Sequence, residues 1–269
     1  MKALLAAAAL ILGSAAADPG VTLDGPPMQG ALLRGAAPAG TLSLTLDGRP
    51  VPLAGDGRFL IGFDRDAGPE ARLVIRRAGG EQVQTLRVAP RAWRIEHVGM
   101  ARPSGGPTPA FQRLREGELA RIGAARTAAS DSIGWTQHFI WPARGRLSGQ
   151  FGSQRIYAGG VPAAYHSGTD IAAGAGAAVV APADAVVTLA PPPMFSLEGN
   201  LVILDHGMGL TSAFLHLSRV SVRTGDHVRQ GQPIGAVGAT GRATGPHLHW
   251  SLMWNGARVD AAAFVGGTP

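Results

Sequence analysis

The sequence predicts a mostly β protein, on the basis of its composition and its residue patterns. The chain has 269 residues, 45% hydrophobic and 16% charged, which is enough for one large domain or two modest ones. Its 39 Gly and 20 Pro exclude a helical bundle or coiled coil, because both residue types interrupt helices. Apolar and polar residues alternate in short stretches between turn signals such as Asp47-Gly48 and Asp56-Gly57, a pattern typical of strands joined by tight turns.

Residues 1–17 are predicted to be a signal peptide. Lys2 precedes an apolar run from Ala3 to Leu12, and Ala15-Ala16-Ala17 has the small-residue pattern of a cleavage site. The run is too short to span a bilayer comfortably, which argues against an uncleaved anchor. We therefore expect export, to the periplasm in preference to secretion, with no stable membrane insertion after cleavage.

Residues 18–100 are predicted to form a small β-sandwich-like domain. Leucines alternate with polar residues from Thr41 to Asp47, and bulky apolar residues alternate from Arg58 to Asp64. A hairpin is expected next, with Leu73 and Ile75 facing Val83 across a turn at Gly79-Gly80.

This domain is predicted to have no chemistry of its own. It holds one histidine, His97, and no cluster of histidine with carboxylate. We interpret it as a spacer or a docking module.

Residues 101–134 are predicted to be a linker that contains one helix. Ala101 to Pro109 is rich in Pro, Gly and Ser, and from Pro109 to Ala129 apolar residues recur near a helical period. The apolar residues of this period are Phe111, Leu114, Leu119 and Ile122, and one helix that joins the two domains is the simplest account. Residues 135–269 return to glycine-rich β sequence and form the second predicted domain.

The absence of cysteine excludes several classes of site. There can be no disulfide framework, thiolate zinc finger, iron–sulfur cluster or cysteine nucleophile, so any metal must be held by histidine and carboxylate. The net charge is +6, and every basic residue except Lys2 is Arg. These arginines are spread along the chain without interleaved aromatics, so a nucleic-acid partner is not supported.

Four of the eight histidines lie in patterned places in the second half of the chain. His166 and Asp170 are four residues apart, His247 and His249 are two apart, and His216 lies between the two pairs. Residues i and i+2 of a strand point to the same face, so His247 and His249 are expected to project together.

His166 and Asp170 can share a metal ion only if the chain bends between them. In an extended strand they would be roughly 13 Å apart, whereas both ligands of a zinc ion lie about 2.0–2.2 Å from it. Gly168 is the residue expected to permit the bend. Two histidines and one carboxylate leave a tetrahedral zinc with an open position, and two further histidines stay available for proton transfer or for stabilising an oxyanion.

The histidine segments resemble the three motifs of the lysostaphin-type (LytM-like) zinc metallopeptidases, which are peptidoglycan endopeptidases. The resemblance runs from near Trp141 to Asp260 and rests on three segments: His166-Ser-Gly-Thr-Asp170, Phe214-Leu-His216-Leu-Ser218 and Gly245-Pro-His247-Leu-His249. It implies that residues 135–269 form a compact, all-β, barrel-like sandwich with a groove across the metal.

The resemblance also implies roles for individual residues. His166, Asp170 and His249 would bind one Zn²⁺ per chain, while His216 and His247 would be catalytic, with the choice of general base open. The implied substrate is the peptide part of peptidoglycan, cut by attack of a metal-activated water on an amide. The bond could join D-alanine to a diamino acid or lie in a glycine bridge, and a regulatory protein partner is compatible with this implied function.

Four residues are further candidates for substrate contact: Tyr157, Tyr165, Asn200 and His206. The family often has tyrosine where this chain has Phe214, so a loop tyrosine is the candidate replacement. Asn200 is equally explained by a turn, and His206 by a structural role. His97, His138 and His227 are interpreted as surface or packing residues, and Trp250 and Trp254 as core.

Two other classes of function fit the same residues. The protein could bind cell-wall peptides and regulate another hydrolase without cutting, or the two histidines and carboxylate could hold iron(II) in a non-haem oxygenase. Oxygenase sites usually pair histidine and carboxylate two residues apart, not four.

Overall fold

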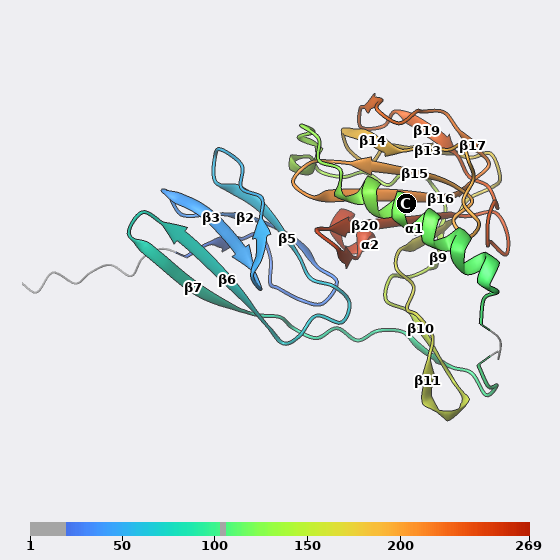
Figure 1. Ribbon diagram of the computed structural model, residues 1–269, viewed down its shortest axis with the longest axis horizontal. Helices are drawn as coiled ribbons and strands as arrows, with labels where there is room; N and C mark the ends of the chain where they lie inside the picture. Colours follow the sequence, from blue (N-terminus) through green and yellow to red (C-terminus); the bar gives the residue numbers. More distant parts are fainter. Residues whose placement is uncertain (1–19, 103–105) are drawn as a thin grey trace, which may run out of the picture.

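The computed structural model describes residues 20–102 and 106–269, and the predicted signal peptide lies outside them. The described chain is mostly β (Figure 1), which confirms the predicted fold class. None of the helices in these two ranges is long and apolar enough to cross a membrane.

Two small antiparallel sheets form the N-terminal region. The first has the order β1-β2-β5 and the second β4-β3-β6-β7. Their strands are β1 (Thr22–Leu23), β2 (Leu32–Ala36), β3 (Thr41–Leu46), β4 (Arg49–Val51), β5 (Arg58–Gly62), β6 (Glu70–Arg77) and β7 (Gly80–Arg87). Side chains from both sheets, including Phe59 and Ile75, belong to one buried cluster.

The β6–β7 hairpin forms, but the predicted facing of Leu73 and Ile75 with Val83 is wrong. Arg77 pairs with Gly80, so the turn lies one residue earlier than predicted, and Val83 pairs with Val74. A one-residue slip exchanges the faces of a strand. Leu73 and Ile75 are therefore fully buried, whereas Val83 is 47% exposed.

A large antiparallel sheet dominates the C-terminal region, with the order β18-β14-β15-β16-β20-β12-β9 and with β21 beside β20. Its strands are β9 (Arg146–Gly149), β12 (Thr169–Ala172), β14 (Ala185–Leu189), β15 (Asn200–Asp205), β16 (Leu210–Leu217), β18 (His227–Val228), β20 (Leu248–Trp254) and β21 (Ala257–Val259). A smaller sheet, β13-β19-β17, consists of β13 (Ala178–Val180), β19 (Pro233–Ala236) and β17 (Arg219–Val220). Trp250 and Trp254 are buried, as predicted.

The N-terminal and C-terminal regions are in direct contact. Strand β5 packs against β20 and β21, and a Cβ added to Gly62 would lie 3.0 Å from Val259 Cγ1. A third small sheet has the order β11-β10-β8, and in it β8 (Ile95–His97), which precedes the linker, pairs in parallel with β10 (Gln154–Tyr157). The other strand is β11 (Val161–Pro162), and the short helices are η1 (Gly134–Thr136), η2 (Ala158–Gly160) and α2 (Ala261–Val265).

The predicted linker helix is α1 (Pro109–Thr127), which lies across the large sheet (Figure 1). The Thr108 side chain caps its N-terminus by accepting from Phe111 N. Of the apolar residues at the helical period, Leu114 and Leu119 are more than half exposed, whereas Ile122 packs on a buried cluster that includes Ala125. Glu118 is buried as well.

Ionic contacts also hold α1 to the loop that precedes β15. Glu118 accepts hydrogen bonds of 2.6 Å from both the backbone N and the Oγ of Ser196. Arg115 pairs with Glu118 and also donates to both carboxylate oxygens of Glu198, at 2.7 and 2.9 Å. Helical periodicity alone could not predict that Glu118 is buried, because its hydrogen-bond donors come from Ser196, which is distant in the sequence.

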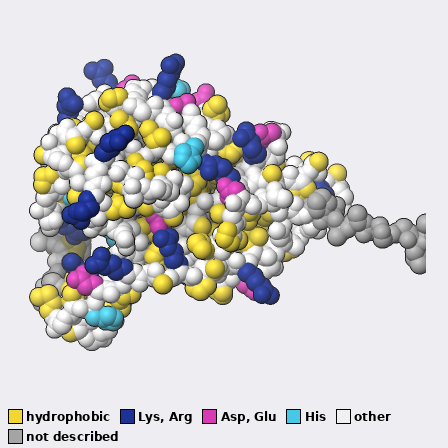
Figure 2. All heavy atoms as spheres, turned by 180° about the vertical axis from the view of Figure 1, so that it is seen from behind, with side chains coloured by type: hydrophobic (Ala, Val, Ile, Leu, Met, Phe, Trp, Pro, Cys, Tyr) yellow, Lys and Arg dark blue, Asp and Glu magenta, His cyan; other side chains and the backbone are white. Residues whose placement is uncertain are grey.

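Charged side chains are scattered over the face seen in Figure 2, where Lys and Arg form no continuous patch. This distribution agrees with the spread of arginine along the sequence.

His206 is a buried histidine outside the three motifs, and its pKa differs strongly from the ordinary value. It is fully buried, its Nδ1 donates to Asp184 O at 3.0 Å, and its Nε2 is 2.6 Å from Ser212 Oγ. Burial disfavours the charged ring and lowers its pKa to about 4.

This histidine should make stability depend on pH. Between about pH 6.5 and about 4, His206 is protonated in the unfolded chain but stays neutral in the folded chain. Acidification through this range therefore lowers the free energy of unfolding by at most about 3 kcal/mol. Urea unfolding should show that the free energy of unfolding falls less between pH 7 and pH 4.5 in His206→Gln than in the wild type, even though the variant is less stable at pH 7. His227→Gln, at an exposed site, is the matched control. An unchanged acid loss in His206→Gln would contradict this account.

Candidate metal centre and groove

The candidate metal centre is built across two neighbouring antiparallel strands. In the register of β12 and β20, Asp170 lies directly opposite His249. On the other side of β20, Leu215 of β16 lies opposite His249. The carboxylate and the imidazole are therefore positioned by the central sheet, and not by mobile loops.

Three polar atoms converge at this point. His166 Nε2 is 3.0 Å from Asp170 Oδ1, His249 Nδ1 is 2.8 Å from the same oxygen, and the two nitrogens are 3.1 Å apart. Among the described residues, these three form the group whose ligand atoms are close enough to hold one metal ion.

The backbone bends at Gly168, between His166 and Asp170, as predicted. Space is a second reason for glycine here, because a Cβ would lie 2.6 Å from His249 Nε2. Gly149 of β9 likewise leaves space for the carboxylate of Asp170, since a Cβ there would lie 2.3 Å from Asp170 Oδ2. Both glycines let the chain approach the ligand side chains closely.

Two members of the cluster, Asp170 and His249, are shifted toward the form that binds a cation, whereas His166 is shifted toward its protonated form. Burial alone would raise the pKa of Asp170, but hydrogen bonds from His166 and His249 hold it well below its usual range. Burial lowers the pKa of His249. The pKa of His166 is raised, because its hydrogen bond and attraction to Asp170 outweigh the effect of burial.

The donor set and spacing fit zinc. A tetrahedral centre with bonds of about 2.0–2.2 Å needs ligand atoms roughly 3.3–3.6 Å apart, so separations of 2.8–3.1 Å need only a small outward adjustment. His166 Nδ1 donates to Gln150 O at 3.1 Å. That bond fixes the tautomer and leaves Nε2 free to ligate.

The two remaining motif histidines flank this cluster. The ring centroids of His216 and His247 are 4.9 Å apart, and His247 Nε2 is 3.9 Å from Asp170 Oδ1. His216 Nδ1 donates to Thr240 O at 2.9 Å, and His247 Nδ1 donates to Gly245 O at 2.8 Å. Each ring, when neutral, therefore keeps Nε2 as a proton acceptor.

His216 has an unusual backbone. Its φ is 65°, a left-handed conformation that non-glycine residues adopt rarely and that often marks a functional position. Burial lowers its pKa, which favours the neutral ring.

A groove of about 1120 Å³ runs past the cluster. All five motif residues line it, and so do Tyr157 and Tyr165. The Tyr165 hydroxyl donates to Asp64 Oδ1 at 2.8 Å, so it is already engaged, whereas Tyr157 lies on β10 at the groove wall.

Asn200 and His206 do not line the groove, which corrects their interpretation as substrate contacts. Asn200 Nδ2 donates to Leu217 O at 2.9 Å, so the side chain supports strand pairing. His206 is enclosed in the core by the contacts described above.

The N-terminal region supplies groove-side contacts that the sequence did not indicate. Besides Asp64, which holds Tyr165, the buried Arg65 donates to Gly152 O at 2.9 Å and to Gln154 Oε1 at 3.0 Å. A spacer would make no such contacts with the loop that precedes His166. No local motif marks Asp64 or Arg65, because their role depends on the packing of the two regions.

Residues 164–261 match the model of peptidase family M23. The chain is 37% identical over 125 residues to the peptidoglycan DD-endopeptidase ShyA of Vibrio cholerae, covering 46% of this chain and 29% of that protein. It is 41% identical over 104 residues to the DD-carboxypeptidase/endopeptidase Mpg of Neisseria meningitidis, covering 39% of this chain and 24% of that protein. The chain thus spans less than a third of the length of these curated relatives.

One solved structure matches over most of the chain. It is a Pseudomonas aeruginosa protein described as an M23 peptidase candidate, with a TM-score of 0.69 and 30% identity, covering 90% of this chain and 96% of that one. The similarity therefore includes the N-terminal region as well as the sheet that carries the metal cluster.

The geometry predicts one zinc ion per chain. Metal-free protein titrated with Zn²⁺ in a calorimeter should bind one equivalent, and His166→Ala, Asp170→Ala and His249→Ala should each abolish that tight binding. His227→Ala, which changes an exposed histidine outside the groove, should bind as the wild type does. Equal binding by all four variants would rule out this cluster.

Proposed function

The chain belongs to peptidase family M23, and we propose that it is an exported zinc endopeptidase that cleaves the peptides of peptidoglycan. The observation that carries the proposal is the convergence of His166, Asp170 and His249 within 3.1 Å of one another in a groove that His216 and His247 also line. A structural zinc site would need a fourth protein ligand and no spare histidines.

The three ligands would hold the zinc and leave one side of it open to the groove. Zinc would act there as a Lewis acid that polarises the scissile carbonyl and acidifies the attacking water. Asp170, whose pKa lies well below its usual range, would be ionised and would balance part of the metal charge.

His216 and His247 would move protons and stabilise charge. With Nδ1–H bound to a backbone carbonyl, each keeps Nε2 as an acceptor, and both residues line the groove. One would accept the proton of the attacking water, and the other, once protonated, would donate a hydrogen bond to the oxyanion. As the C–N bond breaks, the accepted proton would pass to the leaving amine nitrogen. The hydroxyl of Tyr157 is a candidate second donor to the oxyanion. Both tyrosines line the groove, but the Tyr165 hydroxyl is bound to Asp64, whereas no side-chain hydrogen bond of Tyr157 is found among the described residues.

The substrate class is inferred from the relatives. The similar proteins are named a peptidoglycan DD-endopeptidase (ShyA) and a DD-carboxypeptidase/endopeptidase (Mpg). The segment that matches the M23 family, residues 164–261, contains all five motif residues. A substrate in the cell wall would require export, in agreement with the predicted signal peptide.

Peptidoglycan cleavage should depend on the cluster. Purified sacculi incubated with the wild type should lose turbidity and release peptides that mass spectrometry identifies, and removal of the metal by a chelator should stop this until zinc is restored. Asp170→Ala should be inactive, while His138→Ala, which changes an exposed residue, should be fully active. Binding to sacculi without any released peptide would favour a non-catalytic regulator, and oxygen consumption with iron(II) would favour the oxygenase alternative.

The catalytic histidines can be separated from the ligands. His216→Asn and His247→Asn should each lower kcat roughly 10²- to 10⁴-fold, because positioned proton transfer contributes that much, while the zinc content stays at one per chain. Loss of zinc together with activity in both variants would show that they are ligands, contrary to this assignment.

A further inference from the structure

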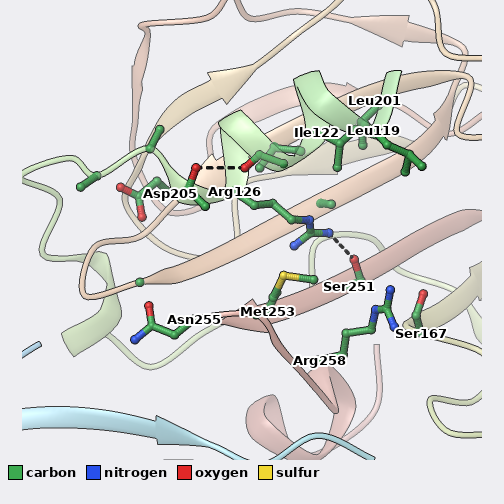
Figure 3. A pocket seen from close by; sticks show the side chains of 18 of the residues that line it. Leu119, Ile122, Arg126, Ser167, Leu201, Asp205, Ser251, Met253, Asn255 and Arg258 are labelled. Atoms are coloured by element: carbon green, nitrogen blue, oxygen red, sulfur yellow. Dashed lines mark hydrogen bonds between the residues drawn. The ribbon is translucent and has the colours of Figure 1, made fainter. Parts of the chain in front are cut away.

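A second cavity lies next to the metal centre, beneath helix α1 (Figure 3). Its volume is about 730 Å³. Three residues of β20 line it in sequence, His249, Ser251 and Met253, and alternate residues of a strand share a face. The cavity is therefore on the face of the sheet that carries the metal cluster. Much of its wall is apolar, made by residues such as Leu119, Ile122, Leu201, Ile203, Ala213 and Leu215.

The guanidinium of Arg126 points from the last turn of α1 into this cavity (Figure 3). It donates to Thr211 Oγ1 at 3.1 Å and to Ser251 Oγ at 3.3 Å. Both partners are neutral hydroxyls, and the ion pairs among the described residues include none to Arg126. A guanidinium in such a place usually has a carboxylate partner, because an unpaired charge is costly to bury.

A second arginine increases the positive charge instead of balancing it. Arg258 of β21 is the cross-strand neighbour of Met253 and lines the same cavity. Burial, with a contribution from repulsion by Arg258, lowers the pKa of Arg126 to about 10. Even so, Arg126 is charged at neutral pH.

The two carboxylates in the cavity wall have other partners. Asp205 accepts from Ser130 N at 2.8 Å and from Gly207 N at 3.0 Å. Glu198 is paired with Arg115 as described above. Arg258 is exposed, and its backbone N donates to Asp64 Oδ2 at 3.0 Å. The positive charge of Arg126, by contrast, has no ion pair among the described residues.

The cavity adjoins the catalytic groove and shares part of its wall. Ser167, Glu198, Leu215 and His249 line both of them. Ser251, to which Arg126 donates, is two residues beyond the ligand His249, which is about 7 Å along a strand. An extended peptide covers that distance with roughly two residues, so a substrate with its scissile carbonyl at the metal centre could place an anionic group at Arg126.

We propose that Arg126, assisted by Arg258, forms a subsite for a carboxylate that the substrate carries on the amine side of the scissile amide. The inference rests on the proposed function, because it concerns the substrate of the same groove. A carboxylate is the anion that a peptide offers, and in a linear peptide the free C-terminal carboxylate lies on the amine side of any cleaved amide. The guanidinium fork accepts it with two parallel hydrogen bonds, and the apolar wall packs against the aliphatic part of the same residue.

The test compares two substrates that differ only in charge. One is a cross-linked muropeptide dimer with free carboxylates on the amine side of the cross-link, and the other is the same dimer with these groups converted to carboxamides. The wild type should show a KM roughly 10- to 100-fold lower for the carboxylate form, the range expected for a charge-assisted hydrogen bond. Arg126→Met should treat the two substrates alike, and Arg113→Met, an exposed arginine on the same helix, should keep the wild-type preference.

A binding measurement gives a readout that does not require catalysis. The carboxylate product peptide should bind metal-free wild type more tightly than its carboxamide in a calorimeter, and this difference should vanish in Arg126→Met. The thermal midpoint of Arg126→Met should be no lower than that of the wild type, because the substitution removes a desolvated charge.

The outcomes separate this inference from the proposed function. Equal KM values for the two substrates in the wild type, or a preference that survives in Arg126→Met, would overturn the subsite. Failure to cut either substrate would overturn the proposed function, and in that case equal binding of the two product peptides by metal-free protein would overturn the subsite as well.

Discussion

The candidate site depends on one carboxylate oxygen, Asp170 Oδ1, that is shared by two imidazoles. Its distances to His166 Nε2 and His249 Nδ1 are 3.0 and 2.8 Å. The sheet imposes this convergence, because Asp170 and His249 are direct partners in the register of β12 and β20. Close packing at Gly149 and Gly168 completes it, since any side chain there would collide with the ligands. His216 and His247 take their places because their strands and turns pack around the same pair.

Much of this arrangement could be predicted from the sequence, because it is encoded locally. The two-residue spacing of His247 and His249 and the glycine between His166 and Asp170 each have one simple structural reading. The mostly β fold and the bounds of helix α1 follow from equally local signals of turns, alternation and helical period. The sequence also predicts a groove across the metal, through the resemblance of its motifs.

What the sequence could not predict depends on contacts between distant segments. Val83 lies on the exposed face of its strand because the turn is one residue earlier than predicted. Helix α1 buries Glu118 because Ser196, in a distant loop, supplies its hydrogen-bond donors. In the sequence, Arg126 resembles any surface arginine of a helix. Only the fold places it beside Ser251, which is 125 positions away in the chain. The N-terminal region likewise has no motif of its own, yet its Asp64 holds the tyrosine that precedes His166. The region therefore supports the wall of the groove, which a spacer would not do, whereas its interpretation as a docking module stays a prediction.

The central claim is that His166, Asp170 and His249 together hold the metal used for hydrolysis. Anomalous diffraction from crystals of the zinc-loaded protein, recorded on both sides of the zinc absorption edge, tests it most directly. We expect one strong peak about 2.0–2.2 Å from His166 Nε2, Asp170 Oδ1 and His249 Nδ1, with its remaining side open to the groove. A peak held by other residues, or the absence of any peak in zinc-loaded crystals, would contradict the account.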